Sequence, residues 1–188
     1  MTSVWKGLSP PYGTIVADPP WRYRKSPQAE GTVHARKLVS DIYRTMSMTE
    51  LAALPVAELA APDAHLYLWV TVPRLFGERD DREGFGPFQI MNAWGFRYIT
   101  MLTWVKTGAP GMGSYFRIDT EHCLFGVRGK APIPPAQRLR NVISAPRGRH
   151  SEKPELLMDI AEKVSPGPRV ELFARRRNPR WDAWGDQI

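Results

Sequence analysis

The chain has 188 residues, of which 43% are hydrophobic and 24% are charged. This length is typical of one domain, and this balance of residues can form a buried core, which excludes a chain disordered by composition. Lysine and arginine together number 26 against 19 acidic residues, so the net charge is +7. A basic chain favours an anionic partner such as nucleic acid or a phosphorylated ligand. We therefore expect residues 1–188 to form a single domain.

Cysteine content and apolar runs exclude further classes of protein. Cys123 is the only cysteine, which rules out an intrachain disulfide and a zinc site of four cysteines. The longest apolar runs, such as residues 64–72, fall short of the roughly 20 residues that a membrane span needs. Residues 1–11 lack the apolar stretch of a signal peptide. The sequence thus predicts a soluble, cytoplasmic protein with no membrane contact.

Short apolar runs that end in turn residues alternate with helical patterns along the chain. Strands are expected over residues 14–17, 64–71, 96–105, 121–127, 141–144 and 169–174. Helices are expected after the capping-box pair Ser47 and Glu50, over residues 85–94, and from Pro154 to Val164. Residues 22–45 show no clear periodicity and are expected to form a long loop. This alternation predicts a mostly parallel α/β sheet, whose ligands bind beyond the carboxyl ends of the strands.

The tetrapeptide Asp18-Pro19-Pro20-Trp21 follows the first expected strand directly. Two prolines hold a turn stiff and donate no backbone hydrogen bonds. Asp18 and the Pro19 carbonyl would then present a fixed pair of acceptors beside the flat ring of Trp21, which suits the exocyclic amine of a planar base. Pro-Pro turns are also common structural features. Taken alone, the tetrapeptide leaves a merely structural turn, capped by Asp18, equally open.

Other reactive residue types give weaker signals. The four histidines lack the paired spacing of metal ligands, and Glu121-His122-Cys123 on a strand would point to alternating faces, so no metal site is predicted. Cys123 is interpreted as a small buried hydrophobe rather than a nucleophile. The run Arg175–Arg177 is either a solvated basic stretch or a phosphate contact. Further basic residues form either a rim around a nucleic-acid strand or an ordinary surface, namely Arg22, Arg24, Lys25, Arg138, Arg140, Arg147 and Arg149.

Six short motifs occur in a fixed order along the chain. They are Asp18-Pro19-Pro20-Trp21, Trp69-Val70, Trp104-Val105-Lys106-Thr107, Glu121-His122-Cys123, His150-Ser151-Glu152-Lys153-Pro154 and Glu171-Leu172-Phe173. This ordered set resembles the MT-A70 family of S-adenosylmethionine-dependent adenine-N6 methyltransferases from about Tyr12 to Gln187. The resemblance implies an α/β fold with a Rossmann-like class I methyltransferase sheet and helices on both faces. It also implies a circularly permuted motif order, in which the catalytic tetrapeptide precedes the cofactor region.

The resemblance also implies roles for individual residues. Asp18 and Pro19 would hold the target amine within the catalytic tetrapeptide completed by Pro20 and Trp21, and Trp21 would pack on or near the target adenine. Lys153 matches the family lysine that contacts the methionine carboxylate of S-adenosylmethionine. The remaining cofactor-binding residues that the resemblance implies, beside Asp18, are Glu171, Arg175, Asn178 and Gln187. Tyr43 and Lys106 join Trp21 as expected substrate contacts.

These implications predict an enzyme that methylates N6 of adenine in nucleic acid. DNA is expected over RNA, because the chain lacks the zinc-finger and partner-binding extensions of the eukaryotic mRNA enzyme. Compact members of the family also look like DNA-modifying enzymes of bacteria and phages. The alternative is a catalytically silent family member that binds nucleic acid as a partner subunit, although such members lose the tetrapeptide that this chain keeps. The sequence leaves a partner subunit and a homodimer both open.

Overall fold

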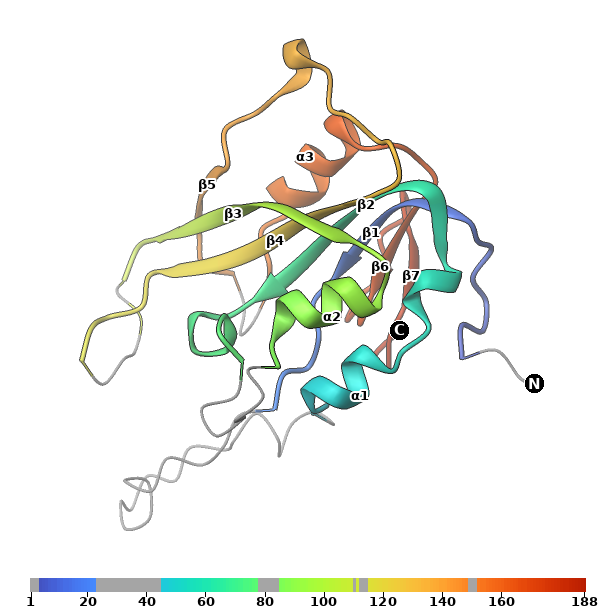
Figure 1. The fold of residues 1–188 in the computed structure, drawn as a ribbon. Helices are drawn as coiled ribbons and strands as arrows, with labels where there is room; N and C mark the ends of the chain where they lie inside the picture. Colours follow the sequence, from blue (N-terminus) through green and yellow to red (C-terminus); the bar gives the residue numbers. More distant parts are fainter. Residues whose placement is uncertain (1–3, 23–44, 78–84, 110, 112–114, 149–151) are drawn as a thin grey trace.

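A curled, mostly parallel sheet organises the computed structural model, which describes residues 4–22, 45–77, 85–109, 111, 115–148 and 152–188 (Figure 1). The strands of the described residues are β1 (Tyr12–Ala17), β2 (Ala60–Val70), β3 (Arg97–Thr107), β4 (Thr120–Arg128), β5 (Val142–Pro146), β6 (Arg169–Leu172) and β7 (Asp182–Trp184). Their order across the sheet is β5-β3-β4-β2-β1-β6-β7. Among these strands only β4 runs antiparallel to its neighbours. The expected α/β class is confirmed.

Three α-helices flank the sheet within the described residues, namely α1 (Met48–Ala52), α2 (Pro87–Ala93) and α3 (Leu156–Val164). The predicted capping box starts α1, because the Ser47 hydroxyl accepts the Glu50 amide and the Glu50 carboxylate accepts the Ser47 amide. Helix α2 is shorter than expected. Its first residue is Pro87, which has no amide to donate and therefore suits the first helical position. Helix α3 ends at Val164, as predicted, and Ser165 caps it.

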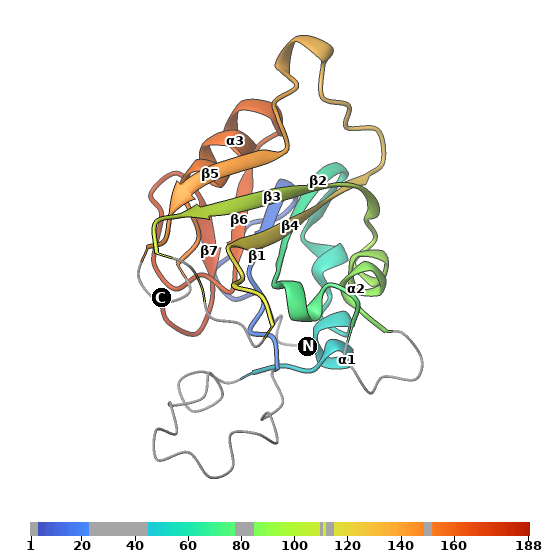
Figure 2. The same cartoon turned by 90° about the vertical axis from the view of Figure 1, so that its left-hand side faces the viewer.

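The helices cover both faces of the sheet (Figures 1 and 2). Side chains alternate along a strand, so Ile15 and Ala17 of β1 face one side and Val16 faces the other. The first pair packs in a core with residues of α1 and α2, whereas Val16 packs in a second core with residues of α3. This two-sided arrangement confirms the expected helices on both faces and explains why β1 is apolar throughout.

The register of the central strands places one edge of the sheet at the expected site. Ala17, the last residue of β1, pairs with Leu68 of β2 and with Leu172 of β6. The chain therefore leaves β1 at Asp18 beside the point where it leaves β6 at Phe173. Phe173 has a φ of 62°, a left-handed conformation that is rare for a residue with a side chain. This conformation turns the chain sharply after β6, where Arg175 follows.

Some expectations differ from the structure or lie outside it. Strand β7 was not predicted, because three residues are too few to show an alternating pattern. The expected long loop falls largely in residues 23–44, outside the described residues, and so does Tyr43. The circularly permuted motif order stays a prediction. No helix in the described part of the chain has the length and apolar character to cross a membrane.

Candidate active site

A cleft of about 790 Å³ opens at the carboxyl ends of β1 and β6. Its lining includes all the residues that the resemblance assigned to the cofactor, namely Asp18, Lys153, Glu171, Arg175, Asn178 and Gln187. Trp69 of β2 and Phe173 also face it. These residues come from four separate stretches of the chain, and the sheet register brings them to one edge. The site therefore lies where ligands bind in parallel α/β folds.

Alternating charges form a row that starts at Asp18. The Nζ of Lys153 lies 2.9 Å from Oδ2 of Asp18 and 2.9 Å from Oε1 of Glu121. Glu121 of β4 in turn meets Nζ of Lys106 through its other oxygen, at 2.8 Å. Arg175 adds a weaker contact, with Nη2 at 3.9 Å from Oδ2 of Asp18. All four groups of the row are largely buried, so each depends on its neighbours for charge compensation.

The pKa values in this row reflect the mutual compensation. Burial lowers the pKa of the Lys153 ammonium, but Asp18 and Glu121 raise it by more, so it ends above the ordinary lysine value. Burial raises the pKa of the Glu121 carboxyl, but Lys153 and Lys106 together bring it below the ordinary value. Near neutral pH both groups are therefore charged.

Two indole rings support the two lysines of the row. Nζ of Lys153 lies 5.5 Å from the centre of the Trp69 ring, and Nζ of Lys106 lies 4.7 Å from that of Trp104. The rings themselves meet edge to face, with their centres 6.2 Å apart. Cations are attracted to the faces of aromatic rings, and Trp is the strongest such partner. Both rings are buried, so the two ammonium groups of the row pack against the core of the protein.

Glu171 is a second acidic group in the cleft. It lies on β6, opposite Val16 of β1. Burial raises the pKa of the Glu171 carboxyl, the charge of Asp18 raises it further, and Arg176 opposes both, which leaves a pKa of about 7. The carboxyl consequently changes its charge around neutral pH. A cationic ligand in the cleft would favour the ionised form.

The tetrapeptide forms a locked turn in which the ring of Trp21 is buried. Trp21 is only 4% exposed, and its indole N–H donates to the Trp69 carbonyl at 3.1 Å. Its amide donates to the Pro19 carbonyl at 2.8 Å, and the Met46 amide donates to the Pro20 carbonyl at 2.9 Å. The expected open stacking face of Trp21 is therefore not seen, because the ring is packed in the core beneath the turn. Its stacking on adenine stays a prediction.

Not every predicted residue joins the cleft. Lys106 instead lines a smaller neighbouring pocket of about 270 Å³, together with Glu121 and Arg147. The expected basic rim is divided, because Arg138 and Arg140 line a third cavity of about 750 Å³ near the amino ends of β3 and β5.

The remaining members of that rim give no further support for it. Arg22 pairs with Glu50 at 3.4 Å. Arg24, Lys25 and Arg149 lie outside the described residues.

Two further expectations concern Cys123 and metal-ligating side chains. Cys123 is buried, as predicted, and burial raises the pKa of its thiol well above the ordinary value. A buried thiol of this kind is inert as a nucleophile. Within the part of the chain that the structure describes, no group of three or more His, Cys, Asp or Glu side chains is placed to hold a metal ion.

Sequence reasoning missed the roles of Glu121 and Trp69. Both occur in motifs that carried the family resemblance, but Glu121 was weighed only as a metal ligand and Trp69 received no role. One signal was available, since Glu121 is a carboxylate on a strand that is otherwise largely apolar, and such a group needs a buried partner. The sequence did not say which lysine would provide it.

A mostly parallel α/β sheet with acids, a lysine and amides at its carboxyl edge defines a class of α/β protein whose ligands bind at that edge. The comparison with protein families is more specific. The family model MT-A70 matches residues 12–187. The chain therefore belongs to the MT-A70 family, a family of N6-adenine methyltransferases.

Individual relatives agree with this assignment. The chain is 32% identical to the type II methyltransferase M.MunI from Mycoplasma sp, over 94% of this chain and 78% of that protein. It is 29% identical to the N6-methyladenosine RNA methyltransferase MTA1 of Cryphonectria parasitica, over 96% of this chain and 52% of that protein. It is 27% identical to the N(6)-adenine-specific methyltransferase METTL4 of Mus musculus, over 94% of this chain and 37% of that protein. The chain thus spans about half or less of the latter two.

Proposed function

We propose that this protein transfers a methyl group from S-adenosylmethionine to the N6 amine of adenine in nucleic acid, with DNA preferred over RNA. The observation that carries the proposal is the position of Asp18. Asp18 directly follows β1 and lies in the cleft that also holds Lys153, Glu171 and Arg175. A target amine held by Asp18 would therefore lie next to whatever the cleft binds.

The residues of the cleft fit S-adenosylmethionine in chemistry and in size. The cofactor carries a carboxylate, an ammonium, a sulfonium, ribose hydroxyls and an adenine ring. Lys153 has three N–H donors, of which Asp18 and Glu121 take one each, so one is left for the carboxylate. Glu171 offers an anion for a cationic group. Asn178 accepts the Arg180 amide through its side-chain oxygen at 3.0 Å, which leaves its NH₂ group to donate.

Gln187 and Arg175 complete the fit. Gln187 lies at the cleft with an amide that can read an adenine edge, and Arg175 supplies further donors for ribose oxygens. A volume of about 790 Å³ lies within the usual range for small-molecule and cofactor sites. The bound cofactor would supply an electrophilic methyl group.

The protein's own residues would activate and position the amine. The lone pair of the adenine amine is delocalised into the ring, which makes it a poor nucleophile. Asp18 and the Pro19 carbonyl would each accept one of its N–H groups, and this favours a tetrahedral nitrogen with a localised lone pair. The Pro19 oxygen already accepts the Trp21 amide, but a carbonyl oxygen has two lone pairs.

Asp18 would act by electrostatic stabilisation rather than by removing a proton first. A carboxylate is too weak a base to deprotonate the neutral amine. Its negative charge instead stabilises the positive charge that would develop on nitrogen as the bond to the methyl carbon forms and the carbon–sulfur bond breaks, and the nitrogen would lose its extra proton afterwards. Lys153 holds the Asp18 carboxylate in place at 2.9 Å, so the carboxylate needs little reorganisation.

The competing proposal is a catalytically silent partner subunit that binds nucleic acid. Such a protein has no need of a carboxylate at the end of β1 or of a lysine fixed beside it. The ordered row Asp18, Lys153, Glu121 therefore favours the enzyme. The proposal leaves two assemblies open, a homodimer and a complex with a partner subunit. Light scattering of the purified protein measures its molar mass and so shows whether it forms a homodimer by itself.

The preference for DNA is tested by competition. Matched single-stranded DNA and RNA oligonucleotides, incubated with the protein and S-adenosylmethionine, are scored for N6-methyladenine at several salt concentrations. We expect more product in DNA, and an affinity that falls with salt at a log–log slope of about −0.7 for each phosphate neutralised. Methylation confined to RNA would overturn the DNA preference, and binding that ignores salt would overturn the electrostatic contribution.

A further inference from the structure

A small pocket lies directly beyond the charged row, on the side away from the cofactor cleft. Its volume is about 270 Å³, and Glu121 and Lys106 both line it. Glu121 also contacts Lys153, which contacts Asp18. The pocket is therefore separated from the proposed target position by only one pair of ionic contacts.

Two segments that lie far apart in the sequence form the walls of this pocket. One wall is residues 71–73, at the start of the 3₁₀ helix η4 (Val72–Arg74), and the other includes Ile118 and Thr120, at the base of the β3–β4 hairpin. Arg147, which follows β5, completes the lining. Its guanidinium donates to the Ile118 carbonyl at 3.0 Å and to Asp119 at 2.8 Å. These bonds fix the hairpin base beside β5.

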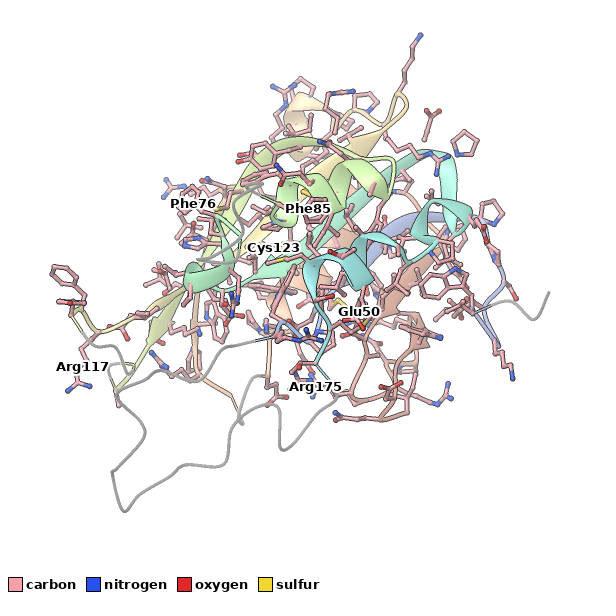
Figure 3. The ribbon with its side chains drawn as sticks, turned by 60° about the horizontal axis from the view of Figure 1, so that its bottom comes forward. Glu50, Phe76, Phe85, Arg117, Cys123 and Arg175 are labelled. Carbon is pink, nitrogen blue, oxygen red and sulfur yellow. The ribbon has the colours of Figure 1, made fainter. Side chains whose placement is uncertain are left out.

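Both walls continue into highly exposed aromatic side chains. Phe76, just after η4, is 87% exposed, and in the hairpin Tyr115 and Phe116 are 94% and 85% exposed. Figure 3 shows Phe76 and Arg117 on the same side of the molecule, with Arg117 at the outer end of the hairpin. None of the three rings lines the pocket, but all three lie on the two segments that continue from its walls, and such exposure is an exception to the usual burial of large rings.

The chemistry around these rings indicates what they contact. Lys106, Arg147 and Arg117 lie on the same two walls or next to them, so the surface mixes flat rings with cations. Protein interfaces are also enriched in aromatic side chains and arginine. The net charge of +7 favours a polyanion, however, and a single nucleic-acid strand needs cations for its phosphates and rings for its bases. The observations therefore favour a single strand over a second protein surface.

We propose that the pocket and the three rings form a track for the nucleotides that flank the target adenine. One flanking nucleotide would lie in the pocket beside Lys106 and Arg147, and further bases would stack on Phe76, Tyr115 and Phe116. This inference rests on the proposed function and deepens it, because it assigns a binding site to the strand rather than to the target base.

The test measures methylation kinetics on a single-stranded oligonucleotide with one central adenine. The double substitution Tyr115→Ala with Phe116→Ala should raise the KM for the oligonucleotide by about 5- to 150-fold for each base–ring stack that is lost. The kcat at saturating oligonucleotide and the Kd for S-adenosylhomocysteine should stay unchanged. The difference in KM between the variant and the unaltered protein should disappear on a substrate trimmed to the target nucleotide, because no flanking base remains to stack.

Conservative and control variants separate stacking from other effects. The pair Tyr115→Phe with Phe116→Tyr should keep the KM of the unaltered protein, whereas leucine at both positions should behave like alanine. Leu139→Ala removes a side chain that is 52% exposed at the distant third cavity, and it should change nothing.

The outcomes that overturn the inference differ from those that overturn the function. An unchanged KM in the alanine pair, or equal rescue by leucine, would overturn the stacking track. A changed oligomeric state with an unchanged KM would assign the rings to a protein partner and overturn it as well. If the unaltered protein neither binds nor methylates any oligonucleotide, the proposed function itself fails.

Discussion

The ammonium of Lys153 donates a hydrogen bond to the carboxylate of Asp18 at 2.9 Å, although the two residues lie 135 positions apart in the chain. The residue expected to bind the cofactor therefore contacts the residue expected to hold the target amine. One substitution in this pair will disturb the other partner. Binding, catalysis and stability must accordingly be measured separately for each variant.

Asp18→Asn should lower the methylation rate by roughly 100-fold or more, which is the typical cost of removing one group that stabilises transition-state charge. The amide keeps the size of the side chain but loses the negative charge. The Kd for S-adenosylhomocysteine should stay within about tenfold, because Lys153 keeps its second carboxylate partner, Glu121. Radiolabelled methyl transfer beside calorimetric titration measures both effects. Asp159→Asn, a surface carboxylate paired with Arg180, is the matched control.

Lys153→Ala should weaken the binding of S-adenosylhomocysteine by roughly 10- to 150-fold, the equivalent of a charge-assisted hydrogen bond. It should also lower the free energy of unfolding by about 3–5 kcal/mol, because Asp18 and Glu121 are left without their shared cation. Calorimetric titration and urea unfolding report the two quantities. The exposed Lys163→Ala should alter neither.

A second substitution distinguishes the two consequences of losing Lys153. Adding Asp18→Asn to Lys153→Ala removes the carboxylate that has lost its closest cation, so part of the lost stability should return while cofactor binding stays weak. If the two substitutions are instead strictly additive in the free energy of unfolding, the buried contact between Lys153 and Asp18 is not a stabilising pair.

Glu171→Gln should remove a pH dependence of stability. The pKa of Glu171 in the folded protein is about 7 against an ordinary 4.5, so its contribution is fully present below pH 4.5 and is lost as the pH rises through 7. The variant should therefore gain stability relative to the unaltered protein between pH 5 and pH 8, by up to about 3 kcal/mol. Urea unfolding at the two pH values measures this. Glu58→Gln, at an exposed position, should show no such gain, and equal behaviour of the two variants would contradict the account.

Trp21→Phe tests the buried position of this ring. The substitution keeps an aromatic core residue but leaves the Trp69 carbonyl without its indole donor, which should cost about 1–3 kcal/mol of unfolding free energy. The KM for the nucleic acid should change less than about twofold, because the ring faces the core. A large rise in KM without loss of stability would instead support direct stacking of Trp21 on adenine.

The order of elements could be predicted from the sequence because local patterns determine it. The apolar run before Asp18 stops at two prolines, and Ser47 with Glu50 marks the start of a helix by spacing alone. Pro87 shortened α2, and the three residues of β7 gave no pattern, since that strand exists only through pairing with β6. Local signals do not carry such long-range pairing.

The candidate site was predictable as a set of residues but not as an arrangement. The motif order pointed to Asp18 and Lys153, and the structure gathers both in one cleft. The contact between them, and the bridge to Glu121, depend on the register of strands far apart in the chain. The burial of Trp21 was missed for the same reason, because its partner is a backbone carbonyl of β2.

The central claim is that the protein methylates N6 of adenine and that Asp18 holds the target amine. Nucleoside mass spectrometry tests this claim most directly. Single-stranded DNA is incubated with S-adenosylmethionine and either the unaltered protein or Asp18→Asn, then digested to nucleosides. The account predicts N6-methyladenine with the unaltered protein and almost none with the variant. Methylation of another base or another adenine nitrogen, or equal product from both proteins, would contradict it.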